Sequence, residues 1–202
     1  MGEDVRLVRA HYDACAEKEW ERLAGFTFEF EITRRIMEQT LRPGMRILDI
    51  GGGPGRYSIY FAGQGYDVTL VDLSPGNIAL AKRKAKEAGT PLRAHACDAR
   101  DLSALPLDKE YDAVFVMSPL YHLFSEEDRL RVLSEAKARL APGGTLFASF
   151  IGLFAGISYY LSECPAEIVN EPAPNYFDCV KENRSWHGTA FTEAYFIHPG
   201  EV

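Results

Sequence analysis

The stretch ILDIGGGPG, residues 47–55, decides the fold of this chain. It is typical of a buried strand with an acid, Asp49, at its end, running directly into a turn with glycines at positions 51, 53 and 55. Glycine lets the backbone turn sharply and approach a ligand without a Cβ in the way. In an open parallel sheet, the first strand-to-helix turn is the usual place for a ligand. The stretch therefore predicts a ligand site at the carboxyl end of this strand.

Outward from this stretch, short apolar runs alternate with helical patterns, which is typical of a parallel α/β sheet. The predicted strands are residues 45–50, 67–72, 92–97, 111–117 and 144–151. The predicted helices between them are residues 57–64, 75–88 and 125–140. We therefore expect the α/β class, with an open parallel sheet and helices on both faces.

The segments on either side of this core have different patterns. Residues 5–23 and 28–41 predict two amphipathic helices, which we expect to pack across the carboxyl edge of the sheet as a partial lid. We expect residues 1–41 to form a helical cap, residues 42–151 the ligand-binding core, and residues 152–202 a C-terminal segment on the substrate side or at an interface. All three are expected within one domain.

Composition and charge exclude several classes of function. The 22 basic and 29 acidic residues are interspersed and give a net charge of −7, which argues against nucleic acid as a partner. No window approaches the roughly 20 apolar residues of a membrane span, and the N-terminus lacks the apolar core of a secretory signal. The four cysteines are far apart, with no zinc-type grouping, so we expect free thiols, no metal site and a cytoplasmic location.

The glycine spacing argues against a nicotinamide dinucleotide as the ligand. Dinucleotide-binding proteins use GxGxxG, whereas the spacing from Gly51 is GxGxG and Arg56 stands where the last glycine would be. Asp49 would repel a pyrophosphate but suits a ligand with an ammonium group. The sequence also lacks the residue groupings of a hydride-transfer site, so a nicotinamide oxidoreductase is disfavoured.

Written as DxGxGxG, the stretch resembles motif I of class I S-adenosylmethionine-dependent methyltransferases. The resemblance implies a Rossmann-like fold, S-adenosylmethionine as the cofactor and methyl transfer as the reaction. It also implies that Asp72 binds both ribose hydroxyls, with Leu73 against the adenine, and that Asp98 and Ala99 read the adenine edge. Met117 matches a position beside the methionine portion. The cofactor residues implied in this way are Asp49, Gly51, Gly52, Gly53, Asp72, Leu73, Asp98, Ala99 and Met117.

A second segment narrows the resemblance. SPLYHL, residues 118–123, and the helix after it resemble a group of small bacterial methyltransferases in which this segment often reads GPLYHL. Ser118 departs from the glycine of that group, which affects the expected local geometry. The resemblance implies a small-molecule acceptor methylated in line, without a metal.

Several side chains are candidates for the acceptor side of the site. His122 is a weak candidate for a general base, and it fits equally a hydrogen-bonded structural residue. Tyr12, Trp20, Tyr121 and Trp186 are candidates for an acceptor pocket or for core positions.

The C-terminal part leaves an alternative function open. Class I methyltransferases close their sheet with a sixth and a seventh strand, and we expect these strands to be missing or incomplete here. We therefore expect strand 145–151 to lack its antiparallel neighbour, and residues 152–202 or a second copy of the chain to cover that edge, as in a homodimer. The alternative is an interaction protein that binds the cofactor without turnover.

Overall fold

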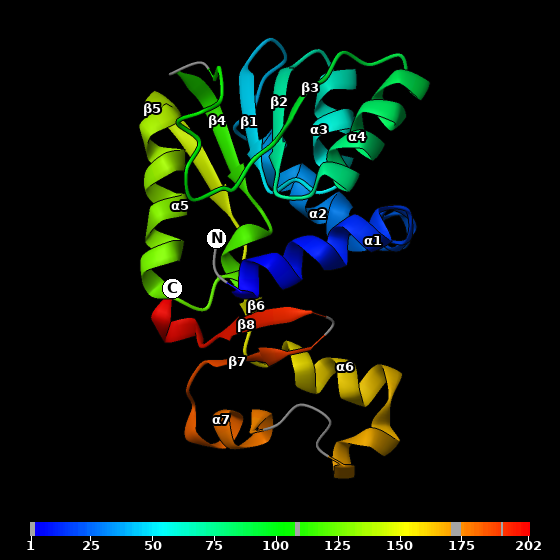
Figure 1. The fold of residues 1–202 in the computed structure, drawn as a ribbon, viewed down its shortest axis with the longest axis vertical. Helices are drawn as coiled ribbons and strands as arrows, with labels where there is room; N and C mark the ends of the chain where they lie inside the picture. Colours follow the sequence, from blue (N-terminus) through cyan, green and yellow to red (C-terminus); the bar gives the residue numbers. More distant parts are fainter. Residues whose placement is uncertain (1–2, 108–109, 171–174, 191) are drawn as a thin grey trace.

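A five-stranded parallel sheet forms the centre of the molecule, as the sequence predicted (Figure 1). The computed structural model describes residues 3–107, 110–170, 175–190 and 192–202. The sheet has the order β3-β2-β1-β4-β5 and consists of β1 (Arg46–Ile50), β2 (Asp67–Asp72), β3 (Arg93–Ala96), β4 (Tyr111–Val116) and β5 (Leu140–Ala148). Strand order reverses between β1 and β4, and ligands in such sheets bind beyond the carboxyl ends of the strands at this point.

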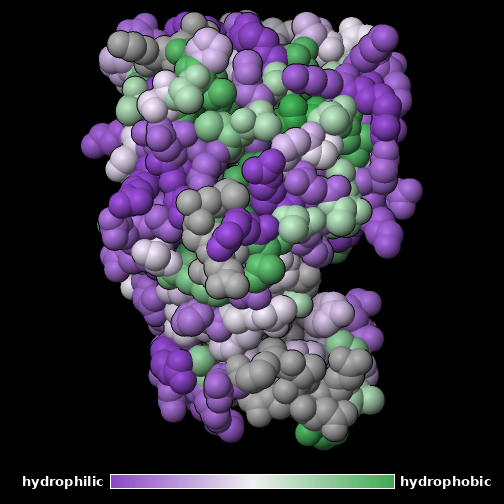
Figure 2. All heavy atoms as spheres, in the orientation of Figure 1, coloured by the Kyte–Doolittle hydropathy of each residue, from purple (hydrophilic) through white to green (hydrophobic). Residues whose placement is uncertain are grey.

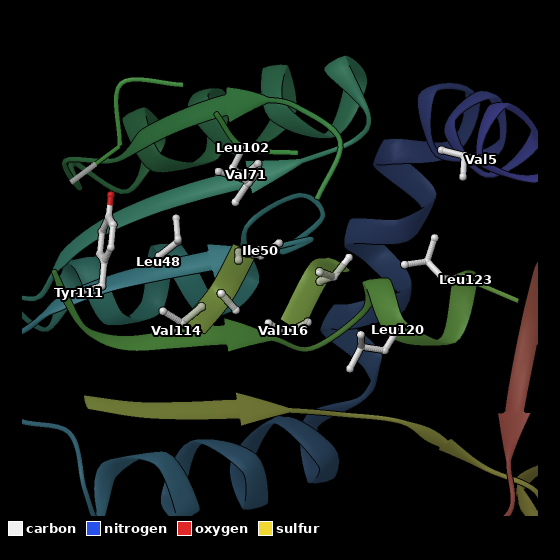
Figure 3. Close-up of a cluster of buried hydrophobic side chains, with 12 residues drawn as sticks. Val5, Leu48, Ile50, Val71, Leu102, Tyr111, Val114, Val116, Leu120 and Leu123 are labelled. Carbon is white, nitrogen blue, oxygen red and sulfur yellow. The ribbon is translucent and has the colours of Figure 1, made fainter. Parts of the chain in front are cut away.

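Helices cover both faces of this sheet because the strands are apolar on both sides. On one face, α5 (Glu126–Arg139) contributes Val132 and Ala136 to a cluster with β1 and β4, part of which is drawn in Figure 3. On the other face, α3 (Arg56–Gly63) packs Phe61 against the sheet, and α4 (Pro75–Glu87) packs Ile78 and Ala81. The predicted Rossmann-like layers are therefore confirmed.

Two helices precede the sheet: α1 (Glu3–Gly25) and α2 (Thr27–Glu38), of which α2 packs its buried Met37 on the face of the sheet that α3 covers. α1 runs across the carboxyl end of the sheet (Figure 1). Its Val5 joins the core cluster of Figure 3, and its Asp13 accepts hydrogen bonds from the Ser74 hydroxyl at 2.5 Å and the Gly76 amide at 3.0 Å. Because Ser74 and Gly76 lie at the start of α4, Asp13 fixes the cap to the N-terminus of that helix.

The C-terminal residues fold into a small lobe that the sequence did not predict. The lobe follows the short helix η1 (Pro119–His122) and β5 in the chain, and lies at the lower end of Figure 1. β6 (Ile151–Gly152), β8 (Glu193–Ile197) and β7 (Trp186–Thr189) form its sheet, in that order. α6 (Ala155–Glu163), η2 (Pro165–Asn170), α7 (Tyr176–Glu182) and η3 (Pro199–Glu201) complete it. Tyr160, Tyr176, Trp186 and Phe196 form its aromatic core.

The outer edge of β5 carries no paired strand among the described residues. β5 pairs with β4, whereas β8 pairs with β6 and β7. Among the described residues, β5 thus lacks an antiparallel neighbour, as expected, and the described strands of residues 152–202 form a separate sheet. The predicted strand 144–151 is in fact divided, because the chain leaves the sheet after Ala148 and the Ser149 hydroxyl bonds to the Met117 carbonyl. Leu146, near the carboxyl end of β5, remains 38% exposed.

The surface is predominantly hydrophilic on the face drawn in Figure 2, and the outline is indented between the core and the C-terminal lobe. Within the described part of the chain, no helix is long and apolar enough to cross a membrane.

Candidate functional site

A cavity of about 740 Å³ opens at the carboxyl ends of the central strands, beneath α1. Its walls come from the glycine turn after β1, the ends of β2 and β4, the start of η1, α1 and residues 149–151. It brings together all the predicted cofactor residues, which are Asp49, Gly51, Gly52, Gly53, Asp72, Leu73, Asp98, Ala99 and Met117. Three of the predicted acceptor-side residues, Tyr12, Tyr121 and His122, also line it.

The glycine turn forms a cradle that other residues would fill. Gly51 has a φ of +73°, and a Cβ there would lie 2.3 Å from Cγ of Pro119. A Cβ on Gly52 would lie 2.4 Å from Oδ2 of Asp49 and 2.5 Å from Cδ1 of Leu70. Glycine is therefore required at both positions, because the turn packs closely against Asp49 and against the start of η1.

Asp49 lies under this turn and is only 1% exposed. The Ser58 hydroxyl donates a hydrogen bond of 2.7 Å to its Oδ2 atom. Burial raises the pKa of Asp49 to about 7; the Ser58 hydrogen bond opposes this rise, and the nearby Asp72 carboxylate adds to it. A cationic group in the cavity would favour the ionised form of this acid.

Asp72, at the end of β2, is held by backbone and side-chain donors. Its Oδ2 atom accepts from the Gly53 amide at 2.8 Å, and its Oδ1 atom accepts from the Ser74 amide at 2.9 Å and the Asn77 side-chain amide at 3.2 Å. Burial nevertheless raises the pKa of Asp72 above its ordinary value, outweighing these donors. The carboxylate is therefore rigidly placed at the cavity wall.

Asn77 is a residue of the site that sequence reasoning missed. It lines the cavity beside Asp72 and is 1% exposed. Among the described residues, its Oδ1 atom is the one buried side-chain oxygen or nitrogen without a hydrogen-bond partner. A buried acceptor left unpaired costs about 1–3 kcal/mol, so the side-chain oxygen of Asn77 is held in place beside Asp72 at an energetic cost. Ser74 caps α4 by accepting a hydrogen bond from the backbone amide of Asn77. The Ser-x-x-Asn spacing of these two residues was the sequence signal that could have identified Asn77.

Asp98 is engaged by an arginine two residues further on. The Arg100 guanidinium donates to Oδ2 of Asp98 at 2.7 Å and also to Asp128 at 2.7 Å. Although burial acts in the opposite direction, these contacts with Arg100 lower the pKa of Asp98. Asp98 is thus a fixed anion at the edge of the cavity beside Ala99.

Tyr12 and His122 form a hydrogen-bonded pair on the acceptor side of the cavity. The Tyr12 hydroxyl lies 3.0 Å from Nε2 of His122, and Nδ1 of His122 lies 2.8 Å from the Glu193 carbonyl oxygen. Tyr121 packs against the His122 ring, with centroids 4.7 Å apart. The pair therefore joins α1, η1 and β8 at one point.

The two predicted tryptophans lie elsewhere. Trp20 is not among the described residues that line the cavity; its ring lies under the Lys84 ammonium, 5.6 Å away, where α1 meets α4. Trp186 is in the core of the C-terminal lobe. The apolar wall comes instead from Phe150, Ile151 and Tyr159, which the sequence did not identify. Phe150 and Ile151 were predicted only as the end of strand 144–151, and Tyr159 belongs to the C-terminal segment, whose pattern predicted no element.

Within the described residues, no group of three or more His, Cys, Asp or Glu side chains is arranged to hold a metal ion.

Comparison with known proteins shows a family similarity over the residues of the central sheet. The methyltransferase domain family matches residues 47–144, which include every predicted cofactor residue. The chain is 31% identical to a ubiquinone biosynthesis O-methyltransferase from Xanthomonas campestris pv. campestris over 154 residues, 73% of this chain and 62% of that protein. It is 34% identical to a glycine/sarcosine N-methyltransferase from Parasynechococcus marenigrum over 130 residues, 63% of this chain and 46% of that protein.

One further curated protein and one solved structure are also similar to this chain. The chain is 34% identical over 107 residues to a protein named Hemagglutinin 1 from Eikenella corrodens, 52% of this chain and 34% of that protein. It thus spans between 34% and 62% of the length of these curated relatives. Among solved structures, a SAM-dependent methyltransferase from Methanosarcina mazei is similar, with a TM-score of 0.60 and 25% identity, covering 81% of this chain and 76% of that one.

Proposed function

The chain belongs to the class I S-adenosylmethionine-dependent methyltransferases, and from this premise we propose that it transfers a methyl group from S-adenosylmethionine to a small-molecule acceptor. The observation that carries the proposal is the meeting of the glycine cradle, Asp72 and the unpartnered Asn77 Oδ1 atom in one cavity. A ribose would add hydroxyl donors to those that already hold Asp72 and would offer a donor to the Asn77 Oδ1 atom.

The remaining cavity residues fit the other parts of this cofactor. Asp49 provides a buried carboxyl near the glycine cradle, which suits the ammonium group of the methionine portion. Leu73 and Ala99 provide apolar contact for a purine, and Asp98 provides a fixed acceptor for its amino group. Met117 lies at the end of β4, on the side of the cavity that leads to Tyr121.

The protein's part in the reaction is to place the acceptor and exclude water. Bound S-adenosylmethionine supplies an electrophilic methyl group on a sulfonium. Alignment and desolvation of the acceptor then provide much of the barrier reduction. Burial lowers the pKa of His122 to about 4, against the opposing hydrogen bond to Glu193, so His122 is a poor general base at neutral pH. We assign it a positioning role.

Methyl transfer itself tests the proposal. Purified protein is incubated with S-adenosylmethionine labelled in the methyl group and a panel of small phenols, catechols and amines, with protein and RNA as controls. We expect label in one class of small molecule and none in protein or RNA. Label in RNA or protein alone would contradict the small-molecule acceptor. Tight cofactor binding without transfer to any compound would favour the interaction protein.

The pKa of Asp49 leads to a prediction about pH. A carboxyl with a folded pKa near 7 and an ordinary value of 3.8 keeps its proton in the folded protein where the unfolded chain releases it. The stability of the ligand-free protein therefore falls as pH rises from about 4 to about 7. Affinity for S-adenosylhomocysteine, which carries an ammonium group, should rise with pH by up to about tenfold per unit below 7 and then level off.

Calorimetric titration at several pH values measures this profile. Asp49→Asn should bind more weakly and lose the rise below pH 7, because the amide does not ionise. A parent profile that is flat from pH 5.5 to 8 would contradict the role assigned to Asp49.

We also propose that two copies of the chain pair along the outer edge of β5. The support is the row of backbone groups on this edge, which no described strand covers, and the 38% exposure of Leu146 within it. Exposed strand edges are templates for pairing with another chain. We place the protein in the cytoplasm, in keeping with its four free cysteines, and expect no nucleic-acid partner.

Light scattering should therefore give the mass of a dimer. Leu146→Lys introduces a charge on the edge strand and should give a monomer. Leu130→Lys, on the exposed face of α5, is the matched control and should stay dimeric. A monodisperse parent monomer would contradict the edge pairing.

We further propose that the three segments divide the work. Residues 1–41 close the cavity, residues 42–151 bind the cofactor, and residues 152–202 contribute the acceptor side through Tyr159 and the contact of Glu193 with His122.

A further inference from the structure

The hydrogen-bonded chain Tyr12–His122–Glu193 joins three segments that are distant in the sequence. His122 is 7% exposed and lies between the Tyr12 hydroxyl of α1 and the Glu193 carbonyl of β8. The Tyr12 and His122 rings meet edge to face, with centroids 5.5 Å apart. Tyr12 also lines the cavity, so one end of this chain faces the space where an acceptor would bind.

The direction of both hydrogen bonds follows from the Glu193 carbonyl. A carbonyl oxygen only accepts, so Nδ1 of His122 carries the hydrogen that it donates to Glu193. A neutral imidazole has one N–H group, which leaves a lone pair on Nε2. The Tyr12 hydroxyl is therefore the donor in its 3.0 Å contact with Nε2.

Burial keeps both rings neutral. It lowers the pKa of His122 to about 4 and raises the pKa of Tyr12 well above its ordinary value, with the nearby Tyr121 phenol adding to the effect on Tyr12. At neutral pH the protons of the Tyr12–His122 pair therefore have a single arrangement. The Glu193 carbonyl oxygen of the C-terminal lobe fixes this arrangement.

A tyrosine hydroxyl in general can both donate and accept. Here the Tyr12 proton is committed to His122, so the oxygen offers the cavity only its lone pairs. We propose that Tyr12 selects methyl acceptors that carry an O–H or N–H group, and that His122 is the positioning residue that fixes this polarity. The inference rests on the proposed function and narrows its substrates to hydroxyl- and amine-bearing molecules, as opposed to thioethers, tertiary amines and carbon acceptors.

The selectivity is tested with matched probe pairs, phenol against anisole and aniline against N,N-dimethylaniline. Their affinities for the protein saturated with S-adenosylhomocysteine are measured by ligand-observed NMR. The parent should bind the donor-bearing member of each pair about fivefold or more tightly, as one hydrogen bond allows. Tyr12→Phe should make the two members bind equally, whereas Tyr66→Phe, at a buried tyrosine that does not line the cavity, should keep the preference.

The role of His122 has its own readout. In ¹⁵N NMR spectra of labelled protein, His122 should be neutral and protonated on Nδ1 from about pH 6 to 8. His122→Phe should free the Tyr12 proton and raise the relative affinity for anisole, which only accepts. A merely structural histidine would not change the phenol-to-anisole ratio.

Three results would overturn the inference: Nε2 protonation of His122, no preference within either pair in the parent, or the same preference in Tyr12→Phe. Failure to bind any probe would count against it equally. A protein that shows the tautomer and the preference but transfers no methyl group would instead refute the proposed function alone, since neither measurement requires turnover.

Discussion

Asp72→Ala is expected to weaken the binding of S-adenosylmethionine and S-adenosylhomocysteine by more than tenfold. A carboxylate that accepts two ribose hydroxyls makes charge-assisted hydrogen bonds worth about 1.5–3 kcal/mol each. The loss should be large because three protein donors already fix this carboxylate at the cavity wall: the Gly53 and Ser74 amides and the Asn77 side chain. Calorimetric titration of both ligands measures the effect.

Two further variants separate ribose binding from a loss of local structure. Asp67→Ala, at the opposite end of the same strand, removes an exposed carboxylate paired with Arg93 and should leave affinity unchanged. Asn77→Ala removes the unpartnered acceptor and should weaken binding less than Asp72→Ala does. If Asp72→Ala binds as tightly as the parent while remaining folded, Asp72 is only a turn residue.

Gly52→Ala should weaken cofactor binding nearly as much as Asp72→Ala does, but for a different reason. The added Cβ would lie 2.4 Å from Oδ2 of Asp49 and 2.5 Å from Cδ1 of Leu70, both of which are buried. The Ser58 hydrogen bond holds the Asp49 side chain, so we expect the turn itself to move. Overpacking of this kind costs about 1–3 kcal/mol of folding stability, and a displaced cradle should lower cofactor affinity by at least about tenfold.

The control for this variant is Gly25→Ala at the end of α1. A Cβ at Gly25 meets no atom within 4 Å, and its backbone needs no left-handed conformation. Thermal unfolding and ligand titration of the two variants should therefore diverge clearly. A Gly52→Ala protein with the stability and affinity of the parent would show that the turn is not closely packed in solution.

The central sheet could be predicted from the sequence because each of its strands is marked locally. Apolar runs bounded by turn residues specified all five strands, and the alternation with helices specified their parallel arrangement. The sequence-predicted cofactor residues also meet in the cavity, because each lies at or just beyond the carboxyl end of a strand. The local sequence pattern and the topology of the sheet agree here, so short-range sequence signals were sufficient to predict both the strands and the cofactor residues.

The C-terminal lobe could not be predicted, because its core comes from distant aromatic residues rather than from a periodic pattern. Tyr160, Tyr176, Trp186 and Phe196 come from two helices and two strands and meet only in three dimensions. The run 144–151 appeared as one strand, yet its last residue, Ile151, belongs to the sheet of the lobe. Apolar content alone does not show where a strand changes partners.

Within the site, the contacts between segments were beyond sequence reasoning. Asp13, which docks the cap onto α4, is one of several acids in α1 and has no motif of its own. Trp20 was considered for the acceptor pocket on residue type, but it lies on the face of α1 that meets Lys84. The assignment of residues to faces of α1 depends on how the helix is placed over the sheet.

The most direct measurement of the central claim is calorimetric titration of the purified chain with S-adenosylhomocysteine and, separately, with NAD. The glycine cradle, the buried Asp49 and the Asp72–Asn77 pair predict saturable 1:1 binding of the adenosyl ligand and no binding of NAD, whose pyrophosphate would meet the Asp49 carboxyl. Saturable binding of NAD with no heat from S-adenosylhomocysteine would contradict the account.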